Sequence, residues 1–183
     1  ITTRLVGSEM CIRDRCMAIE KITGLTAEIK WPNDVVINKK KTTGILTEMG
    51  MSEGKISYVV VGIGINLNME SFPEELAYKA TSLKIECGHE INRDEIAAAL
   101  LFYFEQYYEK FEQTHNLGFL IEEYNNHLVN RGKEVLIKEK EGEYTGISRG
   151  INDKGELLVE KKDGNCVEIF SGEVSVRGLY GYV

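Results

Sequence analysis

Short runs of β-forming residues dominate the first third of the chain, and a helical period dominates its middle. Residues 16–23 fit a short helix that Gly24 would end, whereas residues 1–15 show neither alternation nor a helical stripe. Four later runs predict strands, at 28–31, 35–37, 43–51 and 56–66. Since the last run is almost wholly apolar, we expect a central strand with helices covering both faces of its sheet.

Amphipathic helices are predicted next, followed by a change of period. Residues 93–113 carry an apolar stripe, with Asn92 as N-cap and Glu95 completing a capping box. A second helix is expected at about 117–128 and a short one at 74–79. After residues 130–132 the pattern changes to five short β-like runs separated by turn signals, at 134–138, 143–148, 156–160, 166–170 and 174–177. Such spacing predicts a small β-barrel.

Composition narrows the class of protein. The 183 residues, 43% of them hydrophobic, suffice for one sizeable domain and a small one. With 22 basic against 29 acidic residues the net charge is −7, which argues against a nucleic-acid partner. The four scattered cysteines have neither zinc-site nor disulfide-framework spacing, and no apolar run is long enough to span a membrane. We therefore expect a cytoplasmic protein with no membrane partner, and we assign no residue as a metal ligand.

Candidate chemistry gathers in residues 30–48, which read as strand, tight turn and strand. The turn would bring Asn33, Asp34 and Lys41 together near one end of a sheet. A carboxamide, a carboxylate and a cation in proximity can handle a phosphate and its metal. Each residue alone is better explained as an ordinary surface group. Pro32, which stiffens the approach to Asn33, and Gly44, which permits close backbone approach, make the combination indicative of a site.

Two glycines suggest where a ligand would lie. Gly62 and Gly64 alternate within one strand, so both open onto the same face of the sheet. The gap that they leave would suit either a flat ligand or a helix packed against small residues, and the sequence does not choose between these. Asn66 follows at the end of the strand, where α/β sites often place polar groups.

Four motifs together carry a family resemblance: Lys-Trp-Pro-Asn-Asp, Lys-x-x-Gly-Ile-Leu-x-Glu, Val-Gly-Ile-Gly-Ile-Asn-Leu-Asn and Gly-Ile-Ser-Arg-Gly-Ile-Asn. From about residue 17 to residue 177 the chain resembles biotin protein ligase, the biotin–[acetyl-CoA-carboxylase] ligase family. The resemblance implies an α+β fold, with a mixed or antiparallel sheet and packed helices as in class II synthetases and biotin ligases, followed by a small SH3-like β-barrel. It divides the chain into an unplaced leader (1–16), truncated or foreign, a partial catalytic domain (17–129) and a small C-terminal domain (131–183).

The implied activity is ATP-dependent attachment of biotin, through biotinyl-AMP, to a lysine of biotin carboxyl carrier protein. ATP and biotin would be substrates, with Mg²⁺ as the expected ion and a homodimer as a possible assembly. Lys41 matches the family's active-site lysine, and Asp34 would either orient the incoming lysine or help to hold Mg²⁺. The resemblance assigns catalysis to Lys41 and Asp34, biotin binding to Lys41, Gly62 and Gly64, and ATP binding to Asn33, Asp34, Asn66, Glu173 and Arg177.

One family motif has no match in this sequence. Family members carry a Gly-Arg-Gly-Arg-x-Gly-Arg type of loop upstream of the position of Lys30, together with further biotin contacts. We therefore expect an incomplete ligase chain. The alternative is a non-catalytic module, derived from the ligase, that binds the carrier or forms a dimer. A DNA-binding repressor is a third class, which the acidic charge disfavours.

Overall fold

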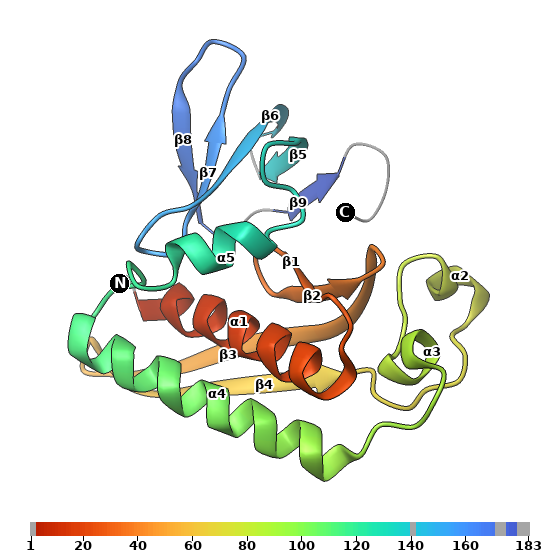
Figure 1. Ribbon diagram of the computed structural model, residues 1–183. Coiled ribbons are helices and arrows are strands. Elements are labelled where there is room, and N and C mark those ends of the chain that lie inside the picture. Colours follow the sequence, from red (N-terminus) through yellow and green to blue (C-terminus); the bar gives the residue numbers. More distant parts are fainter. Residues whose placement is uncertain (1–2, 140–141, 171–174, 179–183) are drawn as a thin grey trace.

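Two antiparallel sheets and five helices make up the part of the chain that the structure, a computed structural model, describes: residues 3–139, 142–170 and 175–178. The first sheet has the strand order β1-β2-β3-β4 and the second has the order β8-β7-β6-β5-β9 (Figure 1). Every pairing between these strands is antiparallel. The α+β class with antiparallel sheets and packed helices is therefore confirmed.

The first sheet comes from the β-forming runs near the start of the chain. Its strands are β1 (Glu28–Lys30), β2 (Asp34–Ile37), β3 (Lys40–Ser52) and β4 (Lys55–Ile65). All four residues of β2 are buried, while β3 and β4 extend beyond it as a long hairpin. Because β2 is short, it pairs only with residues 40–44 of β3, and beyond that point the sheet consists of β3 and β4 alone.

Helix α1 (Thr3–Thr23) lies along this sheet and packs against α4 (Arg93–Thr114) (Figure 1). The prediction that the first helix starts near residue 16 was wrong, because α1 begins much earlier. Cys11, Ile12 and Cys16 are completely buried in it. The charged residues interleaved with them, also buried, break the apolar stripe on which sequence reasoning relies. The proposed division of the chain at residues 16 and 130 stays a prediction.

The expectation that the strand over residues 56–66 is central was also wrong. In the described part of the chain, β3 is the only strand that pairs with β4, and most β4 residues are exposed. One face of the hairpin packs toward α1, where Ile45 is buried. The other face is open, with Leu46, Tyr58 and Val60 exposing 62%, 61% and 52% of their surface. An apolar β-branched run indicates a strand but does not say whether neighbours cover it.

Of the remaining helices, two short ones lie between β4 and α4 in the chain, and the third packs against β1 and β6. They are α2 (Glu74–Ala77), α3 (Leu83–Cys87) and α5 (Ile121–His127). Asn92 caps α4 as predicted, because its side chain accepts a hydrogen bond from the Asp94 N–H. Among the described residues no helix is both long and apolar enough to cross a membrane.

The five strands predicted after residue 130 are present in the described ranges. They are β5 (Glu134–Glu139), β6 (Gly142–Ile151), β7 (Leu157–Glu160), β8 (Cys166–Ile169) and β9 (Ser175–Gly178). Strands β8 and β9 lie at opposite edges, and no pairing joins them among the residues described, so the sheet is open. Closure into an SH3-like barrel stays a prediction.

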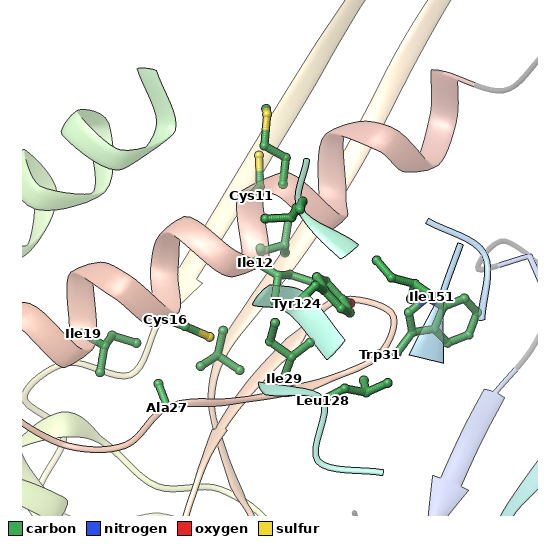
Figure 2. Packing of buried hydrophobic residues seen from close by; sticks show 14 of the residues in the cluster. Cys11, Ile12, Cys16, Ile19, Ala27, Ile29, Trp31, Tyr124, Leu128 and Ile151 are labelled. Carbon is green, nitrogen blue, oxygen red and sulfur yellow. The ribbon is translucent and has the colours of Figure 1, made fainter. Parts of the chain in front are cut away.

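A single buried cluster joins the two sheets. It includes Ile29 and Trp31 from the first sheet region, Tyr124 from α5 and Ile151 from the end of β6 (Figure 2). Trp31, at 2% exposed, is the largest of the fully enclosed side chains in the described part of the chain. The second sheet is thus seated on the core that supports the first.

Candidate functional site

Lys41 and Asp34 form an ion pair at one end of the first sheet. The Nζ atom of Lys41 contacts Oδ1 of Asp34, and the side chains are 40% and 10% exposed respectively. Asp34 begins β2 and Lys41 lies near the start of β3. Two of the three residues that the sequence predicted to converge are therefore paired, a half-exposed cation and a nearly buried carboxylate.

A β-bulge brings the two side chains onto the same face. Asp34 pairs with Gly44 and Val35 with Thr43, but Val36 then pairs with Lys41, which leaves Thr42 as an extra residue in β3. Successive residues of a strand alternate between faces, so one extra residue transfers Lys41 to the face of Asp34 and Gly44. A regular hairpin would have directed the Lys41 side chain to the opposite face.

The tight turn before the bulge fits its sequence. Asn38 and Lys39 both have positive φ, at 49° and 64°, as the turns that join two strands with a two-residue loop require. Asparagine tolerates this conformation well. The side-chain Nδ2 of Asn38 also donates a hydrogen bond to Oε2 of Glu86 at 2.5 Å, which connects the turn to α3.

Gly44 lies directly under the end of the Lys41 side chain. A Cβ added there would lie 3.0 Å from Nζ of Lys41 and 3.7 Å from Oδ1 of Asp34. An added Cβ would require the end of the Lys41 side chain to move by a few tenths of an ångström, and a larger residue would require more. The close approach that the sequence suggested for Gly44 thus serves the ion pair directly.

A glycine floor extends from the ion pair along the open face of the sheet; we define it as Gly44, Gly62 and Gly64. Gly44 pairs with Gly64 and Leu46 with Gly62, so all three glycines face the same side as Asp34. The nearest atoms to an added Cβ on Gly62 or Gly64 belong to β3, at 3.6 Å and 3.9 Å. No helix atom comes that close in the described structure, so packing against a helix does not account for these glycines.

Asn33 secures the turn that leads into Asp34. Its Nδ2 donates to the carbonyl oxygen of Ile45 at 2.8 Å, and the Ile45 N–H donates to the Asn33 carbonyl at 3.0 Å. The preceding Trp31–Pro32 peptide bond is cis. The side-chain amide donor of Asn33 therefore holds the site loop to β3.

Asn66 and a segment after α2 hold the main chain at Lys41. The Asn66 Nδ2 donates to the carbonyl oxygens of Thr81, at 3.1 Å, and Lys41, at 3.5 Å. The Lys41 N–H donates to Lys79 O at 2.8 Å, and the Thr81 N–H donates back to Lys41 O at 2.9 Å. The sequence predicts a short helix over 74–79, whereas α2 ends at Ala77, and residues 79–81 carry no motif from which this contact could be predicted.

Comparison with known proteins shows the family to which this chain is related. A model of the biotin/lipoate A/B protein ligase family matches residues 5–66, and a model of the biotin protein ligase C-terminal domain matches residues 132–177. The apo structure of biotin protein ligase from Aquifex aeolicus is 32% identical, with a TM-score of 0.84, over 95% of this chain and 75% of that chain. The chain belongs to the biotin protein ligase family.

Longer relatives in this ligase family match as well. The bifunctional ligase/repressor BirA of Bacillus subtilis is 36% identical over 160 residues, which is 86% of this chain and 49% of the relative. A structure of the Aquifex aeolicus ligase in complex with biotin and ATP is 31% identical, with a TM-score of 0.84, over 96% of this chain and 73% of that chain. The chain spans about half the length of the curated BirA relatives that it matches.

Two ATP-binding residues expected from the ligase resemblance fall where side chains are not described. Glu173 lies outside the described residues. Arg177 lies in β9 and its backbone pairs with Leu136 of β5, but the structure does not describe its side chain. The nucleotide roles of both residues stay predictions.

The Mg²⁺ that the family resemblance implies stays a prediction. Within the described ranges, no group of three or more His, Cys, Asp or Glu side chains could hold a metal ion. Mg²⁺ is usually bound by one or two carboxylates together with substrate phosphates. Asp34, nearly buried and facing the glycine floor, is a carboxylate of that kind.

Proposed function

We propose that this chain binds biotin and ATP on the open face of its first sheet and contributes the Lys41 chemistry of biotin attachment. The product would be biotin joined to a lysine of biotin carboxyl carrier protein, with biotinyl-AMP as intermediate. The observation that carries the proposal is the Lys41–Asp34 pair at the end of the glycine floor, in a chain of the biotin protein ligase family. The similarity to a ligase structure in complex with biotin and ATP supports it.

In the first step a biotin carboxylate oxygen bonds to the α-phosphorus of ATP, and the bond to pyrophosphate breaks. Negative charge concentrates around the reacting phosphorus. The ammonium group of Lys41, already held in place by Asp34 and the bulge, would stabilise that charge. Gly62 and Gly64 would let the biotin rings lie against the backbone of β4.

In the second step the amine of the carrier lysine attacks the carbonyl carbon of the mixed anhydride, and AMP leaves. Asp34 has two open roles here: it would orient the incoming amine, or hold Mg²⁺ together with the phosphates. Mg²⁺ supplies charge neutralisation at the phosphates when bound. We assign ATP contacts to Asn33, Asp34, Asn66, Glu173 and Arg177, the last two from an SH3-like barrel that the second sheet would complete in a cytoplasmic ligase.

Lys41→Ala tests the assignment, with Lys55→Ala as its matched control. Lys55 lies in the same hairpin at the far end from the site and is exposed. Removing a preorganised charge that stabilises a transition state typically lowers the rate by about 100- to 1,000-fold. We therefore expect the rate of biotinyl-AMP formation, measured by the release of pyrophosphate, to fall by that factor in Lys41→Ala. The rate should be unchanged in Lys55→Ala. Equal rates in the two variants would remove Lys41 from the mechanism.

Gly64→Val tests the glycine floor separately. The added side chain would stand on the open face beside Gly44 and would occupy the space assigned to biotin. Calorimetry should show weaker biotin binding with ATP binding retained. If the variant binds biotin like the wild type, the ligand does not lie over these glycines.

A second candidate function is favoured by the exposed strand β4. This strand pairs on one side only in the described structure, and it exposes Tyr58, Val59 and Val60. Such an edge can accept a further strand from a carrier protein or from a second copy of the chain. A wild-type chain that binds carrier or self-associates, yet binds neither ATP nor biotin by calorimetry, would favour this non-catalytic module over the ligase.

A further inference from the structure

Trp31 connects the second sheet to the candidate site. Its indole Nε1–H donates to the carbonyl oxygen of Gly155 at 3.1 Å. Gly155 lies in the turn between β6 and β7, whereas Trp31 directly follows β1 of the other sheet. Trp31 is 2% exposed. Breaking this hydrogen bond would leave a buried N–H without a partner, which costs free energy.

The partner of Trp31 is itself held in place. The turn that contains Gly155 and the end of β6 before it are held by two hydrogen bonds, one from the backbone of the segment between α4 and α5 and one to a side chain of α5. The Leu117 N–H donates to Asp153 O at 2.8 Å, and the Ile151 N–H donates to Oδ1 of Asn125, in α5, also at 2.8 Å. The Gly155 carbonyl is therefore a fixed acceptor and not the tip of a free loop.

Beyond Trp31 the connection reaches the ion pair without a gap. Asn33 exchanges two hydrogen bonds with Ile45, and the next residue is Asp34. A shift of the indole would therefore be passed to the loop whose far end carries the carboxylate that holds Lys41. The connection is one hydrogen bond, from Trp31 to Gly155, followed by the backbone from Trp31 through Pro32 and Asn33 to Asp34.

We propose that Trp31 is a positioning residue through which the β6–β7 turn sets the orientation of Asn33 and Asp34. Any effect of Trp31 on catalysis rests on the proposed function. The structural coupling between the β6–β7 turn and the loop of Asn33 and Asp34 does not. Trp31 touches no proposed substrate and acts only through the loop that follows it.

Gly155 gives a way to disturb the coupling from its distant end. Gly155 has a φ of +82°, and an added Cβ would lie 2.9 Å from Cδ of Glu9, a side chain with 0% exposure. Gly164 is a matched control, since it has a φ of +84° in the next turn and an added Cβ would meet nothing within 4 Å. Gly155→Ala and Gly164→Ala thus share the backbone strain of positive φ, and only the first displaces a buried neighbour.

Amide hydrogen exchange, followed by NMR on the intact chain without ligand, measures the effect. In Gly155→Ala the Ile45 amide should exchange faster by about three- to ten-fold, the amount expected when one hydrogen bond is weakened. The amide of Leu100, in the middle of α4, should be unchanged, because a merely structural loss of stability would raise exchange at both positions. Gly164→Ala should leave both amides at wild-type rates.

Trp31→Phe provides a second variant that keeps an aromatic side chain in the core and removes the donor. It should raise exchange at Ile45 in the same way. Unchanged exchange at Ile45 in both variants, or equal rises in the two glycine variants, would overturn the inference. If Gly155→Ala does not fold, the exchange rate of the Ile45 amide in Trp31→Phe alone tests the inference.

An activity assay separates this inference from the proposed function. If the function holds, Trp31→Phe and Gly155→Ala should slow biotinyl-AMP formation several-fold, while Gly164→Ala matches the wild type. A wild-type chain that binds neither ATP nor biotin contradicts the function and leaves the exchange result standing. Faster exchange at Ile45 with full activity in both variants would show that the loop moves without consequence, which overturns the positioning role.

Discussion

Asp14 should make the protein less stable as the pH rises. Its side chain is completely buried in α1. Burial raises the pKa of this carboxyl group to about 7, and the adjacent Arg15, with Arg13 nearby, offsets the rise only in part.

The sign and the size of the effect follow from linkage. In the unfolded chain the group titrates near 3.8, so between about pH 4 and pH 7 the folded state holds a proton that the unfolded state has lost. The free energy of unfolding therefore falls as the pH rises through this window, and the loss is complete above pH 7. Three units at about 1.4 kcal/mol each give an upper bound of roughly 4 kcal/mol.

Asp14→Asn removes the titration and keeps the shape of the side chain. Urea unfolding should show little change at pH 5 and a gain of about 1–4 kcal/mol at pH 8 relative to the wild type. Glu112→Gln, at an exposed position of α4, removes a carboxylate without a buried charge and serves as the control. If Asp14→Asn and Glu112→Gln show the same difference between pH 5 and pH 8, burial of Asp14 does not set the pH dependence.

Three further substitutions test the packing by thermal unfolding. Tyr107→Phe should cost about 1 kcal/mol, because the Tyr107 hydroxyl donates to Oε2 of Glu123 at 2.8 Å. Tyr124→Phe should be neutral or stabilising by up to about 2 kcal/mol, since the buried Tyr124 hydroxyl has no hydrogen-bond partner in the described structure. If Tyr124→Phe destabilised the protein more than Tyr107→Phe, both expectations would be contradicted. Gly146→Ala should cost about 1–3 kcal/mol, because an added Cβ would lie 2.5 Å from Cγ1 of Val159, and a wild-type melting temperature would show that β6 and β7 can separate freely.

The local pairing of Lys41 with Asp34 could be predicted, but its cause could not. Turn residues after residue 37 and β-formers on both sides were enough to predict a hairpin and so to bring the two side chains near each other. The face to which Lys41 points depends on the bulge opposite Val35 and Val36. No residue type marks this bulge, so strict alternation would have placed the lysine on the wrong face.

Longer-range features escaped sequence reasoning for different reasons. The exposure of β4 depends on which strands lie beside it, and the composition of a strand does not contain that information. The early start of α1 was hidden because buried charges interrupt the apolar period. Anchoring of Lys41 by residues 79–81 uses only backbone groups, which every residue carries. The five strands after residue 130 were predicted because turn signals punctuate them at regular intervals.

The Asp34 carboxylate also acts as an internal competitor for the Lys41 ammonium. A free phosphate, sulfate or acetate ion would have to displace or share this built-in anion, and would gain nothing from the glycine floor in return. A ligand that covers the floor and also presents a negative group can offset that cost with its apolar contacts. We therefore expect the site to discriminate against simple anions from the buffer, so that the ion pair works as a filter before any chemistry begins.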